Sequence, residues 1–328
     1  MPAEWAPHAR CWMAWPMRPE TFRGAIEPAK RAYAEVASAI SQFEPVTMIC
    51  QQADVAEASL ACKGVEVVAL PISDSWLRDS GPSFVADDMG KIAGVHWRFN
   101  AWGLLYPEHQ EDIEIGGRLL AHLGLPAYRA PLVMEGGAFH VDGEGTLLTT
   151  EQCLLRGNRN PELTRGEIEA QLRAHLGVDT IVWLGDGYDG DETAGHIDEI
   201  ACFLAPGRVL MGVADSASDP NYAICQDNLA RLAAARDARG RQLEIVTVPI
   251  PARREEEGRR LTLSYTNFYR ANGALILPSF EDAADDEAYR ILKRAVPDVE
   301  LVPVPALDIV RGGGGIHCIT QQQPAAAR

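Results

Sequence analysis

The sequence predicts an α/β fold in which one unit, a strand followed by a loop, a hairpin and a helix, is repeated along the chain. Two observations predict it. Short apolar, β-branched segments return at intervals of roughly 50 to 65 residues, as structural repeats do. Helical periodicity fills most of the stretches between them.

The apolar segments are expected to be strands, each preceding a loop rich in Gly, Asp or Pro. They lie at residues 65–72, 125–134, 179–185, 243–250 and 299–306. Alternating apolar and polar residues around the turns DMG, DGEG, APG and ANG predict β-hairpins, whose turns lie at 88–90, 142–145, 205–207 and 271–273.

Amphipathic helices are expected where apolar residues recur with the helical period. These segments are 27–42, 112–124, 164–177, 225–237 and 286–296. Thr164 stands three residues before Glu167, a capping-box pattern that marks the start of the third helix.

With 328 residues, 47% of them hydrophobic, the chain is long enough to bury a large core. No linker divides it, so residues 1–328 are expected to form a single domain in which the repeats bring their loops to one centre. The tail from about residue 321 is expected to fray, and RREEEGRR at 253–260 to form an exposed charged loop.

Composition excludes several classes of protein. A net charge of −16 argues against a nucleic-acid partner and favours a cationic one, although it also serves solubility alone. No apolar stretch approaches the roughly 20 residues of a membrane helix, and the N-terminus lacks a signal-peptide pattern, so the expected location is the cytoplasm. The seven cysteines show no CxxC or Cys/His ligand spacing, which indicates neither a disulfide framework nor a zinc site.

Four of the loops combine titratable residues with glycine. Glycine allows positive φ and a close approach of backbone to ligand, so such loops are typical of the surroundings of a small buried substrate. They are SWLRDSGP at 75–82, MEGGAFH at 134–140, DETAGHIDE at 191–199 and RGGGGIHCIT at 311–320.

Cys318 is the candidate nucleophile. Four glycines precede it, and a thiolate attacks electron-poor carbon readily once a positive neighbour lowers the pKa of the thiol. A buried structural cysteine beside a flexible loop is the alternative. His317 would point away from Cys318 in a strand, so it is assigned no role.

His196 and Asp198 stand two residues apart, so an extended segment would point both side chains at one ligand. A structural histidine remains the alternative. Asp79 and Glu135 are weaker candidates, because each could simply bond to a turn or, for Asp79, pair with Arg78.

Three carboxylates, a histidine and a cysteine fit a cationic electrophile better than an ester or a peptide, whose oxyanion needs hydrogen-bond donors. A guanidinium is planar, charged and lined with N–H donors. Two aspartates can therefore hold it while a thiolate approaches its central carbon.

These residues resemble the agmatine deiminase family, part of the guanidine-modifying superfamily. The resemblance runs over almost the whole chain, through MPAEW, WMAWP, WLRDSGP, EGG with HVDGEGT, DETAGHIDE, SYTNFY and GGGGIHCITQQQP. It implies a five-bladed, pseudo-symmetric α/β propeller of the pentein type, built from ββαβ units.

The resemblance also implies roles. Cys318 would be the nucleophile, His196 the general acid and base, Asp79 and Asp198 the guanidinium clamps, and Glu135 the group that orients His196. Agmatine would be hydrolysed to N-carbamoylputrescine and ammonia through an amidino-thioether on the cysteine. No metal or organic cofactor is implied, because the substrate carries its own electrophile and leaving group.

The interpretation extends to the residues that would contact the substrate tail. Trp76, Trp102 and Gly315 complete the expected substrate-binding set, since aromatic faces suit an aliphatic chain that ends in an ammonium. An acidic loop with Asp186, Asp189 and Asp191 is expected to assist.

Two departures from the family pattern leave the tail open. Ala194 stands where an asparagine is common, and Leu104 stands where a second glycine often follows AWG. Arg78 is expected to point away from the pocket and Arg311 to lie at its rim, which favours agmatine over arginine.

Other readings stay open. The chain resembles bacterial peptidyl-arginine deiminases too, and arginine, methylated arginines or transfer of the amidino group to an amine would use the same Cys and His. A non-catalytic binding propeller is a further alternative. The sequence leaves a homo-oligomer open.

Overall fold

Each apolar segment singled out in the sequence forms the last strand of a small sheet in the computed structural model, which describes residues 1–326. Each of these strands pairs in parallel with its neighbour, so the strand predictions are confirmed. The strands are β3 (Glu66–Ala69), β6 (Ala127–Val133), β9 (Thr180–Leu184), β12 (Glu244–Pro249) and β17 (Glu300–Pro305).

The predicted hairpins supply the other two strands of four sheets, and they too are confirmed. They are β4 (Ser83–Ala86) with β5 (Ile92–Arg98), β7 (Phe139–Val141) with β8 (Thr146–Thr150), β10 (Ala201–Ala205) with β11 (Arg208–Val213), and β15 (Tyr269–Ala271) with β16 (Ala274–Ser279).

The remaining sheet closes the ring. Its strand order is β18 (Thr320–Pro324), β1 (His8–Ala14), β2 (Val46–Cys50) and β3, with β1 antiparallel to β18 and parallel to β2. The expectation that the tail frays from about residue 321 is therefore wrong for 321–324. The glutamines that suggested a solvated tail pair through their backbones with β1, and the Trp12 indole N–H donates to Oε1 of Gln323 at 2.9 Å.

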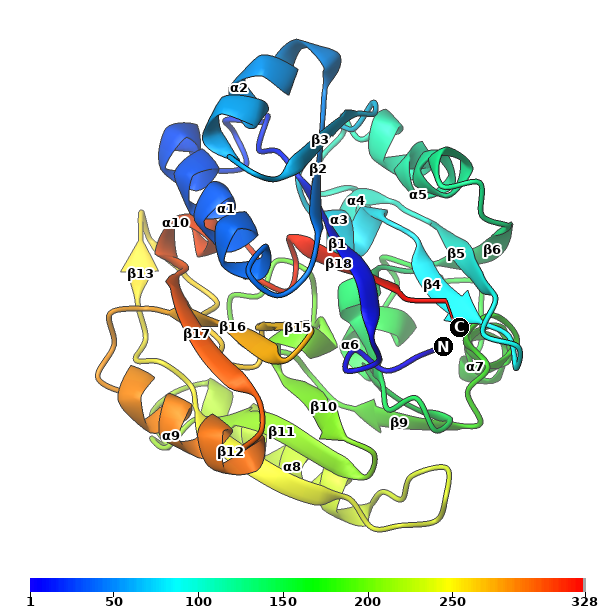
Figure 1. Cartoon of the computed structure of the whole chain (residues 1–328). Coiled ribbons are helices and arrows are strands. Elements are labelled where there is room, and N and C mark those ends of the chain that lie inside the picture. The colour runs from blue at the N-terminus through cyan, green and yellow to red at the C-terminus, as the bar shows by residue number, and fades with distance from the viewer. Residues whose placement is uncertain (327–328) are drawn as a thin grey trace.

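All five predicted helices are present, and their ends lie within four residues of the expected positions. They lie around the outside of the ring (Figure 1). The third begins with the predicted capping box, in which Thr164 and Glu167 exchange side-chain-to-backbone hydrogen bonds. The helices are α1 (Ile26–Ile40), α5 (Gln110–His122), α7 (Arg165–Leu176), α8 (Asn221–Ala234) and α9 (Asp285–Ala295).

The repeated sheets, arranged around one axis, form the five-bladed α/β propeller, or pentein fold, that the sequence predicted (Figure 1). Side chains from sheets and helices meet in buried clusters; Tyr33 of α1 and Leu292 of α9, for example, share one cluster with the central Ile276. Among residues 1–326, no helix is both long and apolar enough to span a membrane.

The charged segment at 253–260 is only partly the exposed loop that was expected. It forms a short hairpin, β13 (Glu255–Glu256) with β14 (Arg259–Arg260). Arg260 is buried, and its charge is paired there: its guanidinium donates to both carboxylate oxygens of Asp219 at 2.9 Å.

Short helical turns carry the loops that leave the last strand of each sheet. They include α3 (Leu77–Ser80) after β3, the 3₁₀ turns η2 (Gly136–Ala138) after β6 and η3 (Ile197–Glu199) after β9, and α10 (Leu307–Val310) after β17. The remaining short elements are α2 (Val55–Ala61), α4 (Ala101–Leu104), α6 (Glu151–Leu155) and η1 (Gln52–Asp54).

Candidate active site

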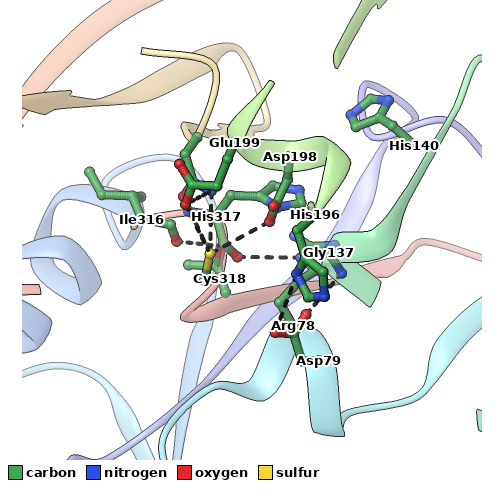
Figure 2. A network of polar contacts seen from close by, with 12 residues as sticks. Arg78, Asp79, Gly137, His140, His196, Asp198, Glu199, Ile316, His317 and Cys318 are labelled. Carbon is green, nitrogen blue, oxygen red and sulfur yellow. Dashed lines mark hydrogen bonds and ion pairs between the residues drawn. The ribbon is translucent and has the colours of Figure 1, made fainter. Parts of the chain in front are cut away.

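Asp79, His196 and Asp198 lie around Gly137, as Figure 2 and the space at this glycine show. A Cβ atom placed on this glycine would lie 2.6 Å from Nδ1 of His196, 2.9 Å from Oδ2 of Asp198 and 2.9 Å from Oδ1 of Asp79. Only a glycine fits such a position. Two loops far apart in the sequence thus place their titratable residues around a glycine of a third loop.

Cys318 lies in the turn that precedes β18, and it is 3% exposed. Its Sγ is 3.3 Å from Nδ2 of Asn267, 3.5 Å from Oδ2 of Asp198 and 3.8 Å from Oε1 of Glu199. Burial and the carboxylates of Asp198, Glu199 and Asp79 raise the pKa of the thiol well above its usual value. The expectation of a positive neighbour that lowers this pKa is wrong, because the nearest charged groups are carboxylates.

His196 is fully buried between two carboxylates. Its Nδ1 is 3.8 Å from Oδ2 of Asp79, and its Nε2 is 3.7 Å from Oε2 of Glu135. Burial lowers the pKa of the imidazole, but Asp79, Cys153 and Glu135 together raise it well above the usual value. His196 is therefore held as an imidazolium that can give up a proton.

His196 and Asp198 meet at Gly137 although the segment is not extended as expected. Asp198 lies in the 3₁₀ turn η3. The loop before it is organised by Asp191, whose carboxylate accepts backbone N–H bonds from Thr193 at 2.8 Å and Gly195 at 2.7 Å. Asp191 is thus occupied with the loop itself, and not with a substrate tail.

Asp79 has each carboxylate oxygen fixed by a donor. Oδ1 accepts from the Gly137 N–H and Oδ2 from the Trp102 indole N–H, both at 2.9 Å. Burial raises the pKa of this carboxyl, while His196 opposes that rise. Trp102 adopts a left-handed backbone conformation with φ of 55°, a strained geometry that aims its indole at Asp79.

Asp198 is the other carboxylate beside the thiol. Its Oδ2 lies 2.8 Å from Nδ1 of His317, and its buried Oδ1 has no hydrogen-bond partner among residues 1–326. Burial favours the neutral form, but the hydrogen bond and charge of His317 and the charge of His196 keep the pKa of Asp198 below its usual value.

Glu135 is held by a residue that sequence reasoning missed. Nε of Arg159 donates to Oε1 of Glu135 at 2.7 Å, and both side chains are fully buried. Burial raises the pKa of Glu135, yet Arg159 and His196 bring it below the usual value. The other carboxylate oxygen of Glu135, Oε2, faces His196.

Sequence reasoning also missed Asn267, Glu199 and His317. Asn267 lies in SYTNFY, in the loop between β12 and β15, and its Nδ2 contacts Glu199 and Cys318. His317 was expected to point away because a strand was assumed, but residues 316–319 form a turn. Arg78, expected to point away from the pocket, is absent from the pocket lining. Its backbone is helical, in α3, where an extended segment was assumed, and its buried side chain places Nη1 3.4 Å from Glu4.

A pocket leads outward from Cys318 and Asp79. Besides these two residues it is lined by Trp76, Trp102, Leu105, Tyr106, Glu192, Thr193 and Gly312 to Gly314. Glu192 forms an ion pair with Arg259 of β14. Trp76 and Trp102 thus lie where they were expected, and Glu192 is the acidic residue that faces this space.

Several predicted tail residues lie elsewhere. Gly315 is absent from the lining; it packs against Asn267, whose Oδ1 would be 2.4 Å from an added Cβ. Asp186 pairs with the exposed Arg156, and Asp189 with Arg260. Ala194 and Leu104 do not line the pocket either, and Arg311 pairs with Glu256.

A buried thiol, an imidazolium and clustered carboxylates at the centre of a five-bladed α/β propeller define a class: a guanidine-modifying hydrolase of the pentein fold. The family described as Porphyromonas-type peptidyl-arginine deiminase matches residues 1–324. The chain belongs to this family, and within it to the agmatine deiminases.

Individual relatives support this placement. The agmatine deiminase of Stutzerimonas stutzeri is 48% identical, over 99% of this chain and 95% of its own length. A solved structure of Enterococcus faecalis agmatine deiminase superposes with a TM-score of 0.97 at 38% identity, covering 100% of this chain and 96% of that one. A C. jejuni agmatine deiminase variant with substrate bound gives a TM-score of 0.91 at 27% identity, covering 99% and 96%.

Proposed function

We propose that this chain hydrolyses the guanidinium group of agmatine to N-carbamoylputrescine and ammonia, with Cys318 as the nucleophile. One observation carries the proposal: Asp79, Asp198 and His196 surround Gly137, and the Cys318 thiol lies 3.5 Å from Asp198 at the inner end of the aromatic pocket. Curated agmatine deiminases that are 47% and 48% identical to this chain support the same activity.

The first step is binding of the guanidinium between Asp79 and Asp198. Each carboxylate faces a cation with several N–H donors, and a charge-assisted pair of this kind is strong when buried. The bound cation also supplies the positive charge that the thiol lacks, because it offsets the carboxylates that raise the pKa of Cys318. Binding therefore favours the thiolate.

The second step is attack on the guanidinium carbon. The thiol releases its proton to solvent water as the cation binds, and the sulfur then forms a bond to this carbon. His196 gives its own proton to the departing nitrogen as the C–N bond breaks, which releases ammonia and leaves an amidino-thioether. Glu135 holds the imidazolium in place through its Oε2. His196, now neutral, takes a proton from water that adds to the same carbon. The C–S bond then breaks, and the hydroxyl proton passes to the departing sulfur, which releases the carbamoyl product and restores the thiol.

The pocket supports a preference for a tail that ends in an ammonium. Trp76 and Trp102 border an aliphatic chain, and Glu192 presents a carboxylate in the lining. Arginine would bring its own carboxylate toward Glu192, a like-charge contact that lowers its affinity. Agmatine, which lacks that group, fits the charge of the pocket.

Neither a metal nor an organic cofactor is required by this scheme, because the substrate provides the electrophile and the leaving group. We place the activity in the cytoplasm, where reduced thiols persist. Fractionation of cells that express the chain tests this placement, and light scattering of the purified chain tests for a homo-oligomer.

Ammonia release from agmatine, arginine, methylated arginines and arginyl peptides tests the function. Cys318→Ala is expected to lose turnover by about a million-fold, as removal of a nucleophile typically does. Cys225→Ala, which alters a buried core cysteine outside the site, serves as the control. Retention by Cys318→Ala of more than about a hundredth of the wild-type rate contradicts the assignment.

Mass spectrometry separates the hydrolase from the alternatives. The wild-type chain mixed with agmatine and quenched in acid during turnover should carry an amidino adduct on the peptide that contains Cys318. Reproducible absence of the adduct at saturating substrate indicates direct attack by water. Formation of a new guanidine when a second amine is added indicates an amidinotransferase.

A further inference from the structure

His317 bridges two buried carboxylates. Its Nδ1 lies 2.8 Å from Oδ2 of Asp198, and its Nε2 lies 2.7 Å from Oε1 of Glu4. All three residues are buried, and Figure 2 shows His317 beside Asp198 and Cys318. A neutral imidazole carries a single N–H, so it can donate to only one of two such oxygens.

Glu4 is held as a carboxylate. Burial raises its pKa, but the charges of His317 and Arg78 and the hydrogen bond of His140 bring it well below the usual value. Nη1 of Arg78 lies 3.4 Å from Oε1 of Glu4. Because Glu4 and Asp198 are both ionised acceptors, the ring between them needs a proton on each nitrogen.

A metal ion is the competing explanation for Glu4, His140 and His317, whose ligand atoms lie within 4.8 Å of one another. The contacts of His140 argue against it. Its Nδ1 is 3.3 Å from the backbone N–H of Phe203, which can only donate, so the ring proton is on Nε2, 3.4 Å from Glu4. A ligand nitrogen needs a free lone pair, and the adjacent Arg78 would repel a cation.

We infer that His317 is a positioning residue: as an imidazolium anchored on Glu4, it holds Asp198 ionised and turned so that Oδ1 remains for the guanidinium of the substrate. The inference rests on the proposed role of Asp198 as a clamp. Oδ1 is buried with no partner among residues 1–326, while Oδ2 is occupied by His317 and lies against the thiol. A single imidazolium thus assigns different tasks to the two oxygens.

Replacement of His317 by Gln should weaken substrate binding more than it slows chemistry. KM for agmatine is expected to rise roughly tenfold to a hundredfold, the range of one lost charge-assisted hydrogen bond, with a smaller change in kcat. The acid limb of kcat/KM should move to higher pH, because Asp198 loses the cation that keeps its pKa low. A role in folding alone would not shift this limb.

Glu4→Gln provides a second variant. It removes the anchor, so it should raise KM and shift the acid limb in the same direction, and the double variant should be little worse than either single one. His140→Gln is the matched control. It removes an imidazole from the same carboxylate but has no contact with Asp198, so its KM should stay within about threefold of wild type, roughly 0.65 kcal/mol.

Labelling of Cys318 tests the clamp without turnover. In His317→Gln, a cationic haloacetamidine should react at least about tenfold more slowly than with wild type, the effect of one lost charge-assisted contact, while neutral iodoacetamide should react at nearly the wild-type rate. If agmatine were not the substrate, the turnover assay would fail in wild type while this labelling contrast persisted. Failure of the proposed agmatine hydrolysis and failure of the proposed role of His317 can therefore be told apart.

Nitrogen NMR of the unaltered, ¹⁵N-histidine-labelled chain gives a readout that needs no variant to fold. Both ring nitrogens of His317 should still carry a proton at pH 7, above the usual histidine pKa of about 6.5. A ring that titrates near 6.5, or a neutral tautomer at pH 7, overturns the inference. So does a His317→Gln variant that folds and keeps the wild-type KM and acid limb.

Discussion

The guanidinium of Arg159 joins the loop of Glu135 to the loop of His196. Its Nε donates to Oε1 of Glu135 and its Nη2 to the carbonyl oxygen of Thr193, both at 2.7 Å. Because the ion pair is fully buried, it is a fixed strut between the residue that orients the imidazole and the segment that carries it.

Arg159→Met should therefore impair both stability and catalysis. An uncompensated buried carboxylate typically costs about 3–5 kcal/mol. The pKa of Glu135 should rise without Arg159, so the acid limb of kcat/KM should move to higher pH. Denaturant unfolding and pH–rate profiles measure the two effects.

Arg165→Met is the matched control, because its ion pair with Glu151 is largely exposed and should contribute at most about 1 kcal/mol. An Arg159→Met variant with an unshifted acid limb would show that Arg159 has no effect on the charge of Glu135.

Glu192 should determine the preference for agmatine. We expect wild-type kcat/KM for agmatine to exceed that for arginine by at least roughly a hundredfold, about 2.7 kcal/mol. Glu192→Gln should lower the value for agmatine and narrow the ratio, because it removes the carboxylate in the pocket lining.

Asp186→Asn controls for a general loss of negative charge, since that carboxylate lies on the surface against Arg156. Equal kcat/KM values for the two substrates in the wild-type chain would instead point to a broader guanidine hydrolase.

Ala194 and Leu104 carry backbone strain. Their φ angles are 64° and 67°, in the left-handed region that costs a residue with a Cβ roughly 1–2 kcal/mol. Ala194→Asn and Leu104→Gly should each raise the free energy of unfolding by about 1 kcal/mol, since Asn and Gly tolerate this region.

Urea unfolding measures the change, with Ala230→Gly as the opposite control. That residue is exposed within α8, where glycine should destabilise the chain by about 1 kcal/mol. Lower stability of both variants would mean that side-chain contacts outweigh the strain.

Asp112 should make the fold less stable as pH rises. Its buried Oδ1 accepts from the backbone N–H groups of Ser73 and Asp74, yet burial raises the pKa of its carboxyl to about 7. An unfolded Asp titrates near 3.9, so this group destabilises the fold progressively between about pH 4 and 7, by at most roughly 4 kcal/mol.

Asp112→Asn keeps the acceptor and removes the charge. It should match wild-type stability near pH 4 and exceed it at pH 8, as thermal unfolding across pH would show. The exposed Asp298→Asn should show no such divergence. Parallel curves for Asp112→Asn and wild type would mean that Asp112 titrates normally.

The repeat could be read from the sequence because burial dictates it. Strands such as 179–185 and helices such as 164–177 have periodicities that their packing requires, and both formed as predicted. The sequence also identified the loops that the structure brings together, because glycine beside a titratable residue is a local signal. These loops carry Asp79, Glu135, His196, Asp198 and Cys318. That residues 1–328 form one domain stays a prediction.

The predictions that failed concern residues whose contacts come from distant segments of the chain. Arg159 meets Glu135 only after folding, and no local pattern marks it. The pKa of Cys318 was misjudged because carboxylates from other loops surround it. His317 was assumed to lie in a strand, and the tail glutamines were taken as solvated because their partner, β1, lies at the other end of the chain.

The pairing of β18 with β1 has a consequence for the order in which the molecule matures. Cys318 lies just before β18, so the segment that closes the ring is also the one that delivers the nucleophile. Since His8 pairs with Pro324, this closure has the longest loop to restrict and is expected to come late in folding. A nascent chain that has not yet been extended past Cys318 has neither a closed ring nor the nucleophile, so it cannot modify guanidines.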